Sequence, residues 1–246
     1  MTDPTQALSF GAAAADYDRF RPRYPQAALG WALDGLDPSA RVVDLGAGTG
    51  ILTRGVLALG HQVVPVEPDP GMRAQLDAAT PGVTALAGSA ESVPLPDHAA
   101  DAVLVGQAYH WFDKERAHVE IARVLRPGGT FAPIWNTRDT SVPWVAELGR
   151  IADLRDHSGN LIEKVTDFGP AFGAVELGEF SHRTTLTPAE VVGMLRTRSY
   201  WLTATPEERE KVDRELRELF VTHPDLAGRE TVELPYRTLV FRARRR

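Results

Sequence analysis

The sequence of 246 residues predicts a single doubly wound α/β domain with a mostly parallel sheet and an antiparallel edge strand near the C-terminus. Three observations predict this fold. Short apolar segments alternate with helical stretches of about ten to fifteen residues through the first half of the chain. A glycine-rich loop joins the first of these strands to a helix. Two further strands near the C-terminus are separated by helices, an arrangement that suits an antiparallel hairpin at the sheet edge.

The apolar periodicity defines the expected elements in chain order. Pro22 and Pro25 prevent a continuous helix at the N-terminus, and Gly60 ends the helix after the glycine loop. A turn is expected at Arg126-Pro127-Gly128-Gly129. The expected strands are 41–45, 62–66, 83–87, 102–105, 130–135, 174–185 and 231–243; the expected helices are 26–36, 51–59, 72–78, 114–125, 143–154 and two within 188–220.

Composition excludes several classes of function. The formal net charge is −6, whereas a general nucleic-acid binder carries a basic face, so no nucleic-acid partner is expected. The chain has no cysteine, which removes disulfides and thiolate chemistry, and its histidines lack ligand spacing, so we expect no metal. No apolar run approaches the roughly 20 residues that span a bilayer, and no signal peptide is visible. We therefore expect no membrane partner and a cytoplasmic location.

The segment Val42–Gly50 carries the main functional signal. Its glycines let the backbone turn tightly beside a ligand, and the helix that follows offers free N–H groups. A dinucleotide-binding loop has glycine at its sixth position, where this chain has Ile51. Asp44 would repel a pyrophosphate but suits a ligand that carries an ammonium group. A nicotinamide-dependent oxidoreductase is therefore the weaker alternative.

An acidic residue, Glu67, ends the second predicted strand. A carboxylate at this position can accept hydrogen bonds from both hydroxyls of an adenosine ribose. The alternative is a solvent-exposed carboxylate at the end of a strand.

Together these segments resemble the class I S-adenosylmethionine-dependent methyltransferases, which implies a Rossmann-like fold and S-adenosylmethionine as cofactor. The segments 88–91, 101–105 and 125–129 match the family in the right order, so 40–136 is the expected cofactor-binding core. The resemblance implies that the glycine loop cradles the amino-acid end of the cofactor, that Glu67 binds the ribose and that the 88–91 turn flanks the adenine. The cofactor-binding residues expected in this core are Asp44, Gly46, Ala47, Gly48, Gly50, Glu67, Pro68, Met72, Ala90, Glu91 and Gln107.

A narrower resemblance is to the trans-aconitate methyltransferase-like subset, through the segments 10–25, 107–113, 135–139 and 196–200. It implies an N-terminal lid over 1–25 and a helical insertion over 186–228 that covers the substrate pocket. It also implies that Tyr17 or Arg21 reaches the methionine carboxylate; a guanidinium can bind a carboxylate through two parallel hydrogen bonds. The alternative for Tyr17 is an aromatic anchor that packs the lid down.

Side chains that follow the fourth and fifth strands are expected to line the acceptor pocket, because open α/β sheets bind ligands beyond the carboxyl ends of their strands. His110 is either a proton-transfer group or a structural histidine wedged between aromatic rings. His118 is expected to be solvated on a helix face. Arg138, Arg196 and Arg198 are candidate anchors for an anionic acceptor. The expected pocket residues are Tyr109, His110, Trp111, Trp135, Arg138 and Tyr200.

The expected reaction is an in-line transfer of a methyl group to a small-molecule acceptor, at a carboxylate or hydroxyl oxygen. Such a transfer depends mainly on alignment of the reacting atoms and on exclusion of water. A base is required only if the accepting atom begins protonated. A non-catalytic protein that binds the same cofactor is an alternative, and the oligomeric state is not readable from the sequence.

Overall fold

The structure is a computed structural model that describes residues 14–152, 165–197, 201 and 204–246. Within them a six-stranded sheet has the order β2-β1-β3-β4-β6-β5. Its strands are β1 (Arg41–Leu45), β2 (Gln62–Val66), β3 (Ala100–Gly106), β4 (Leu125–Arg138), β5 (Glu176–Leu186) and β6 (Val232–Arg244). The first four pair in parallel, whereas β6 runs antiparallel to both β4 and β5. The predicted fold class, with its antiparallel edge, is therefore confirmed.

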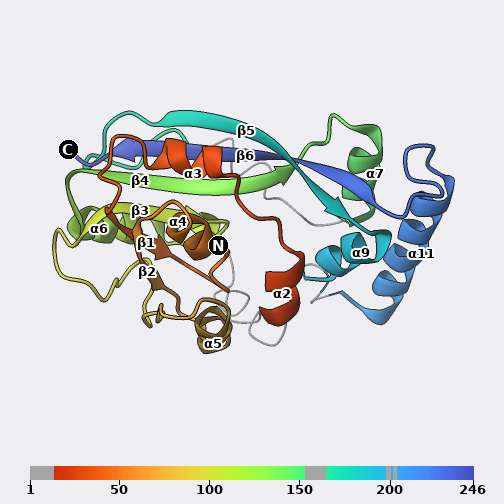
Figure 1. Ribbon diagram of the computed structural model, residues 1–246, viewed down its shortest axis with the longest axis horizontal. Coiled ribbons are helices and arrows are strands. Elements are labelled where there is room, and N and C mark those ends of the chain that lie inside the picture. The colour runs from red at the N-terminus through yellow and green to blue at the C-terminus, as the bar shows by residue number, and fades with distance from the viewer. Residues whose placement is uncertain (1–13, 153–164, 198–200, 202–203) are drawn as a thin grey trace.

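Helices cover both faces of this sheet, as the alternating sequence pattern predicts (Figure 1). On one face, Leu29 of α3 (Gln26–Ala32) and Val56 of α4 (Ile51–Leu57) pack with Leu104 of β3. On the other face, Ile121 of α6 (Lys114–Val124) packs with Phe131 of β4. Helix α5 (Pro70–Ala79) follows β2. The cavity that forms the candidate site lies at the carboxyl ends of β1 and β3.

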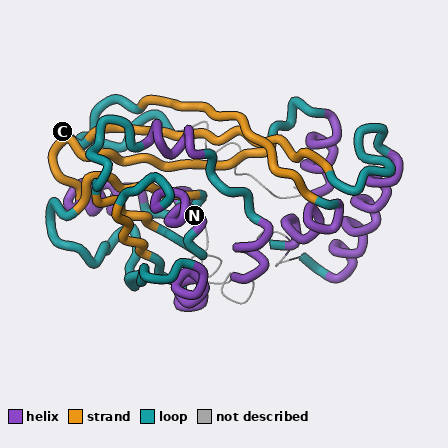
Figure 2. Tube along the Cα trace, viewed as in Figure 1, coloured by secondary structure: helices purple, strands orange, loops and turns teal. Residues whose placement is uncertain are grey.

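A second group of helices packs around the far ends of β5 and β6. These helices are α7 (Pro143–Ala152), α9 (Pro188–Arg196) and α11 (Pro206–Thr222), and they bury one shared apolar cluster. Thr187 and Thr205 each begin a helix with a capping box, which satisfies free N–H groups of the first turn. Figure 2 shows this helical group joined to the rest of the molecule by the long strands β4, β5 and β6. None of the described helices is long and apolar enough to cross a membrane.

Two predicted elements differ from the structure. The expected strand 83–87 makes only a single parallel bridge, Val66↔Leu86. Leu86 alone pairs with β2, donating to Pro65 O (2.9 Å) and accepting from Glu67 N–H (3.0 Å). The turn expected at 126–129 lies within β4, with a register shift against β3. Gly128 N–H donates to Arg245 O (3.0 Å), so pairing with the C-terminal segment extends the strand.

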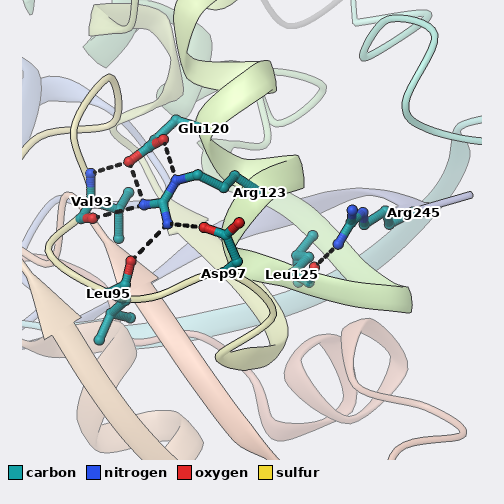
Figure 3. A network of polar contacts seen from close by, with 7 residues as sticks. All are labelled: Val93, Leu95, Asp97, Glu120, Arg123, Leu125 and Arg245. Atoms are coloured by element: carbon teal, nitrogen blue, oxygen red, sulfur yellow. Dashed lines mark hydrogen bonds and ion pairs between the residues drawn. The ribbon is translucent and has the colours of Figure 1, made fainter.

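One arginine of α6 fastens the segment that leads into β3 (Figure 3). Arg123 donates to the carbonyls of Val93 (3.1 Å) and Leu95 (2.9 Å) and to the carboxylate of Asp97 (2.8 Å). Glu120 binds Arg123 from the same helix and also accepts from Val93 N–H (2.8 Å). A loop without regular structure thereby has its backbone groups satisfied by a helix.

Candidate functional site

The glycine loop turns directly from β1 into α4 and is tied to the neighbouring strand. Gly46 N–H (2.8 Å) and Ala47 N–H (3.1 Å) both donate to Val66 O at the end of β2. Gly46, Gly48 and Gly50 all have positive φ, at 71°, 55° and 82°. Gly50 is the N-cap of α4. The loop therefore follows a path that L-residues with a Cβ rarely adopt.

The three glycines of the loop differ in what surrounds them. A Cβ on Gly46 would lie 2.8 Å from Ala108 Cβ, and one on Gly50 would lie 2.8 Å from Leu76 Cγ. A Cβ on Gly48 would meet nothing within 4 Å. Gly46 and Gly50 are thus required by packing within the protein, whereas the space beside Gly48 is open to a ligand.

Asp44 is a fully buried acid beneath this loop. Its Oδ2 accepts a hydrogen bond from Thr53 Oγ1 (2.6 Å), but its Oδ1 has no hydrogen-bond partner. Burial raises the pKa of Asp44 to about 7, against the lowering effect of the Thr53 hydrogen bonds, and nearby Glu67 raises it further. A buried, half-satisfied carboxylate fits a cationic ligand, because a positive charge would compensate for its desolvation.

Glu67 lies at the end of β2 and joins two parts of the site. Its carboxylate accepts from Gly48 N–H (2.9 Å) and from Asp69 N–H (2.9 Å). Asp69 in turn caps α5 by accepting from Met72 N–H (2.9 Å). Burial raises the pKa of Glu67, against the two backbone hydrogen bonds that lower it. Glu67 is therefore a buried group that shapes the loop, rather than a solvent-exposed carboxylate.

A small cavity of about 50 Å³ lies between this loop and the N-terminal segment. Tyr17 and Arg21 belong to α2 (Ala14–Phe20) and the residue that follows it, and Arg21 stacks over the Tyr17 ring at 4.5 Å. Arg21 also donates through Nε and Nη2 to the side chain and carbonyl of Thr197 (both 3.1 Å). The cavity is lined by Tyr17, Arg21, Pro22, Tyr24, Asp44, Gly46, Ala47, Gly48, Thr49, Ile51, Leu52, Gly106, Gln107 and Asn136.

Two polar residues at the ends of β3 and β4 complete the cavity wall. Gln107 has a positive φ of 61°, a conformation that is uncommon outside glycine, and its Nε2 donates to Asn136 O (3.0 Å). The Asn136 amide donates to the carbonyls of Pro22 (3.4 Å) and Arg23 (3.2 Å) and accepts from Thr238 Oγ1 (2.6 Å). Asn136 thereby holds the N-terminal segment against the sheet.

The predicted cofactor residues fall into two groups. Tyr17, Arg21, Asp44, Gly46, Ala47, Gly48 and Gln107 line the cavity. Gly50, Glu67, Pro68, Met72, Ala90 and Glu91 do not line it. Of this second group, Ala90 is buried in the core, and the Glu91 carboxylate accepts from Asp113 N–H (3.0 Å).

Sequence reasoning missed seven lining residues: Pro22, Tyr24, Thr49, Ile51, Leu52, Gly106 and Asn136. Three of these stand in segments that carried the narrower family resemblance. They are Pro22, Tyr24 and Asn136. Tyr24 is partly buried, and desolvation raises the pKa of its phenol well above the usual value.

Among the described residues, those predicted to line the acceptor pocket do not gather at the cavity. Tyr109 and Trp135 lie in the core, 2% and 3% exposed, where their rings pack edge to face at 5.8 Å, so neither lines this cavity. His118 is only partly exposed to solvent, contrary to the expectation: its Nε2 lies 2.7 Å from Tyr109 Oη beside the same aromatic cluster. Periodicity placed His118 on an exposed helix face because the segment 165–172, which covers it, lies far away in sequence.

His110 and Trp111 lie on a short 3₁₀ helix (Tyr109–Trp111), with ring centroids 4.7 Å apart, and neither lines the cavity. Arg138 ends β4, two residues after Asn136 and so on the same face of the strand. Tyr200 and Arg198 lie outside the described residues. Arg196 forms an ion pair with Asp213 of α11 (2.8 Å).

Comparisons with known proteins agree with this geometry. A family model described as a methyltransferase domain matches residues 43–132. An uncharacterized methyltransferase of Mycobacterium tuberculosis is 44% identical over 96% of both chains. A malonyl-[acyl-carrier protein] O-methyltransferase of Methylococcus capsulatus is 34% identical over 51% of this chain and 49% of its own length. A solved structure of a candidate type II methyltransferase from Anaeromyxobacter dehalogenans has a TM-score of 0.64 and 24% identity, covering 92% of this chain and 98% of that one.

The fold, the matching family model and the full-length relatives define the chain as a class I S-adenosylmethionine-dependent methyltransferase, and the oxidoreductase alternative is set aside. The residues fit that cofactor, because Asp44 presents an unpartnered carboxylate oxygen to a cationic group and Gly48 leaves space beside it. The chain belongs to the methyltransferase family that its full-length relative and the matching domain represent.

Proposed function

We propose that the protein methylates a small molecule at a carboxylate or hydroxyl oxygen. When bound, S-adenosylmethionine supplies an electrophilic methyl group on a sulfonium. The observation that carries the proposal is the closed position of Tyr17, Arg21 and Tyr24 over the glycine loop. An acceptor that reacts beneath such a roof must be small or extended, and a covered site also excludes water.

We assign the two buried acids to opposite ends of the cofactor. The free Oδ1 of Asp44 supports a contact with the ammonium of the methionine part, and Glu67, at the end of β2, supports a contact with the ribose. The space beside Gly48 supports close approach of the ligand to the backbone. Tyr17 and Arg21 are assigned to the methionine carboxylate, although Arg21 would then share its donors between that carboxylate and Thr197.

An oxygen acceptor is favoured by the polar groups around the end of β4. Asn136 lines the cavity, and Arg138 shares its face of the strand, so the polar side chains at this end of β4 favour a polar or anionic acceptor. A carboxylate oxygen is already deprotonated at neutral pH and needs no base. The relative named as a malonyl-[acyl-carrier protein] O-methyltransferase is consistent with a carboxylate acceptor.

His110 is the candidate base for the other case, an acceptor that begins protonated. His110 follows β3 and lies beside Trp111, so its titratable ring is close in sequence to the carboxyl end of a parallel strand, where such sheets bind ligands. A pH–rate profile of His110→Ala with an identified acceptor decides its role. If the variant's profile loses the dependence of rate on pH near neutrality, His110 acts as a base; an unaltered profile contradicts that role.

We further infer that residues 1–25 act as a lid and that 186–228 cover the acceptor. The contacts of Arg21 with Thr197, which follows α9, support an arrangement in which both segments close over one site.

Two measurements test the proposed function. Isothermal titration calorimetry with S-adenosylmethionine and S-adenosylhomocysteine should give dissociation constants between micromolar and sub-millimolar, and NADH should not bind. A screen of metabolite fractions with isotopically labelled methyl donor should then transfer label to small acids or phenols. Label found only on proteins or nucleic acids would contradict the small-molecule acceptor.

A further inference from the structure

The cavity under α2 is small and is roofed by the N-terminal segment. It holds about 50 Å³, whereas pockets for small molecules are typically about 300–1,000 Å³. The roof consists of Tyr17, Arg21, Pro22 and Tyr24, all from the N-terminal segment. A ligand group that enters this cavity lies directly beneath the segment, so the contacts that fasten the segment bear on ligand binding.

One acidic residue of α2 makes the contacts that fasten the helix to the glycine loop. Asp18 Oδ1 accepts from Thr49 Oγ1 (2.9 Å) and from the guanidinium of Arg54, with which it forms an ion pair. Thr49 belongs to the loop that lines the cavity, and Arg54 belongs to the helix that follows it. The next residue back along α2 is Tyr17, so Asp18 is fastened beside the roof itself.

Arg54 is held in place on the core side independently of α2. Its Nη1 donates to Thr49 O (2.8 Å) and to Thr80 Oγ1 (3.3 Å) at the end of α5. These contacts do not involve the N-terminal segment, so Arg54 can remain in position when α2 leaves. Asp18 is the moving half of the pair and Arg54 the stationary half.

The strength of this contact suits an element that must open. The side chains of Asp18 and Arg54 are 16% and 25% exposed, so water partly screens the ion pair. Thr49 adds a directed hydrogen bond to the same carboxylate oxygen. The only other cation within ion-pair distance of Asp18 among the described residues is Arg23, more distant at 3.5 Å and more than half exposed.

The other side of the N-terminal segment faces the helical group. Phe20 packs against Gly193 of α9, where a Cβ would lie 2.9 Å from the ring. Arg21 binds Thr197 at the end of the same helix. The segment is thus fixed at one end to the cofactor core and at the other to the insertion.

We propose that Asp18 and Arg54 are positioning residues that latch α2 onto the glycine loop, holding Tyr17 and Arg21 over the bound cofactor. The proposal rests on the assignment of this cavity to the cofactor. Release of product requires the latch to open, so its strength sets how quickly S-adenosylhomocysteine leaves.

The test is a double-mutant cycle read by stopped-flow dissociation of S-adenosylhomocysteine. Asp18→Asn keeps an oxygen for Thr49 but removes the charge, and Arg54→Gln removes the cation. Each variant should raise the dissociation rate about three- to tenfold, and the double variant should raise it no further than the larger single effect. Arg237→Gln breaks an exposed ion pair with Glu179 on β5 and should leave the rate unchanged.

Amide hydrogen exchange distinguishes a latch from a general structural role, because only a latch predicts faster exchange confined to the N-terminal segment. In Asp18→Asn, the amides of 16–24 should exchange several-fold faster with ligand bound, while those of β1 and α4 stay protected. Unchanged exchange in 16–24 and an unchanged dissociation rate would overturn the latch and leave the cofactor site standing. Additive effects in the cycle would also overturn it. If the unmodified protein binds no S-adenosylhomocysteine, the assignment of the cavity fails and the latch fails with it.

Discussion

Asp44 and Glu67 are two buried acids beneath one loop, and they differ in how far the protein satisfies them. Both oxygens of Glu67 accept a backbone N–H, whereas Asp44 Oδ1 accepts none. A group left unsatisfied inside a folded protein is costly and is often retained for function. At the scale of single residues, the site therefore depends most on Asp44.

Replacement of Asp44 should separate stability from binding. The pKa of Asp44 is about 7 in the folded protein and 3.8 in the unfolded chain, so the folded state binds the proton more tightly. The resulting stabilisation is fully present below pH 3.8 and is lost as the pH rises through 7. Without ligand, the stability that Asp44→Asn gains over the unmodified protein should therefore be about 2–3 kcal/mol larger at pH 8 than at pH 5.

Urea unfolding at both pH values measures this difference, and calorimetry should show that Asp44→Asn binds S-adenosylhomocysteine at least about tenfold more weakly. Equal effects on stability at pH 5 and pH 8 would contradict a raised pKa.

Gly48→Ala should block the ligand while leaving the fold intact. The new methyl group meets no protein atom within 4 Å, and the positive φ costs about 1 kcal/mol. We expect the melting temperature to fall by about 2–4 °C and affinity for S-adenosylhomocysteine to fall at least about tenfold. Gly228→Ala is the matched control, with positive φ and an equally open Cβ position away from the site. A similar loss of affinity in both variants would contradict a ligand beside Gly48.

At the scale of elements, α6 acts as a support for a loop as well as a cover for the sheet. The guanidinium of Arg123 and the carboxylate of Glu120 together satisfy backbone groups of Val93 and Leu95 (Figure 3). The segment they hold lies between the turn at 88–91 and β3 and contains no helix or strand. Its conformation therefore depends on these contacts with α6.

Arg123→Gln should destabilise the protein by about 1–3 kcal/mol, because the carbonyls of Val93 and Leu95 lose a charged donor. Denaturant unfolding measures the change. Arg150→Gln, which breaks an exposed pair with Glu147 on α7, should cost less than about 1 kcal/mol. Equal losses in the two variants would mean that Arg123 contributes only as a surface ion pair.

At the scale of the whole molecule, the sheet and the N-terminal segment connect two groups of helices. The long strands β4, β5 and β6 run from the cofactor core into the helical group, and the N-terminal segment bridges the two from the side (Figure 1). A ligand beneath that segment should therefore stabilise the molecule as one unit.

S-adenosylhomocysteine at about one hundred times its dissociation constant should stabilise the folded state by about 2.7 kcal/mol. For a chain of this size, we expect the melting temperature to rise by about 5–10 °C. Scanning calorimetry measures the shift, with NADH as the control. Two separate unfolding transitions, of which only one shifts to higher temperature with ligand, would show that the helical group unfolds independently.

Much of the fold was predictable because local patterns define it. The strands at 41–45 and 62–66 and the glycine loop follow from β-branched runs and from glycine, which act over a few residues. The wrong predictions involve contacts between distant segments. The strand expected at 83–87 is reduced to one bridge with β2, and His118 is partly covered by the segment at 165–172.

By itself, the sequence determined the fold class, the loop from Val42 to Gly50, and the acids Asp44 and Glu67, because these features depend on residue type and short spacing. Only the tertiary structure decided which glycine of this loop faces open space. It also decided that Tyr109 and Trp135 lie in the core and that Asp18 fastens α2 to Arg54. Burial and pairing of this kind arise only when segments far apart in the chain pack together, so no local pattern records them.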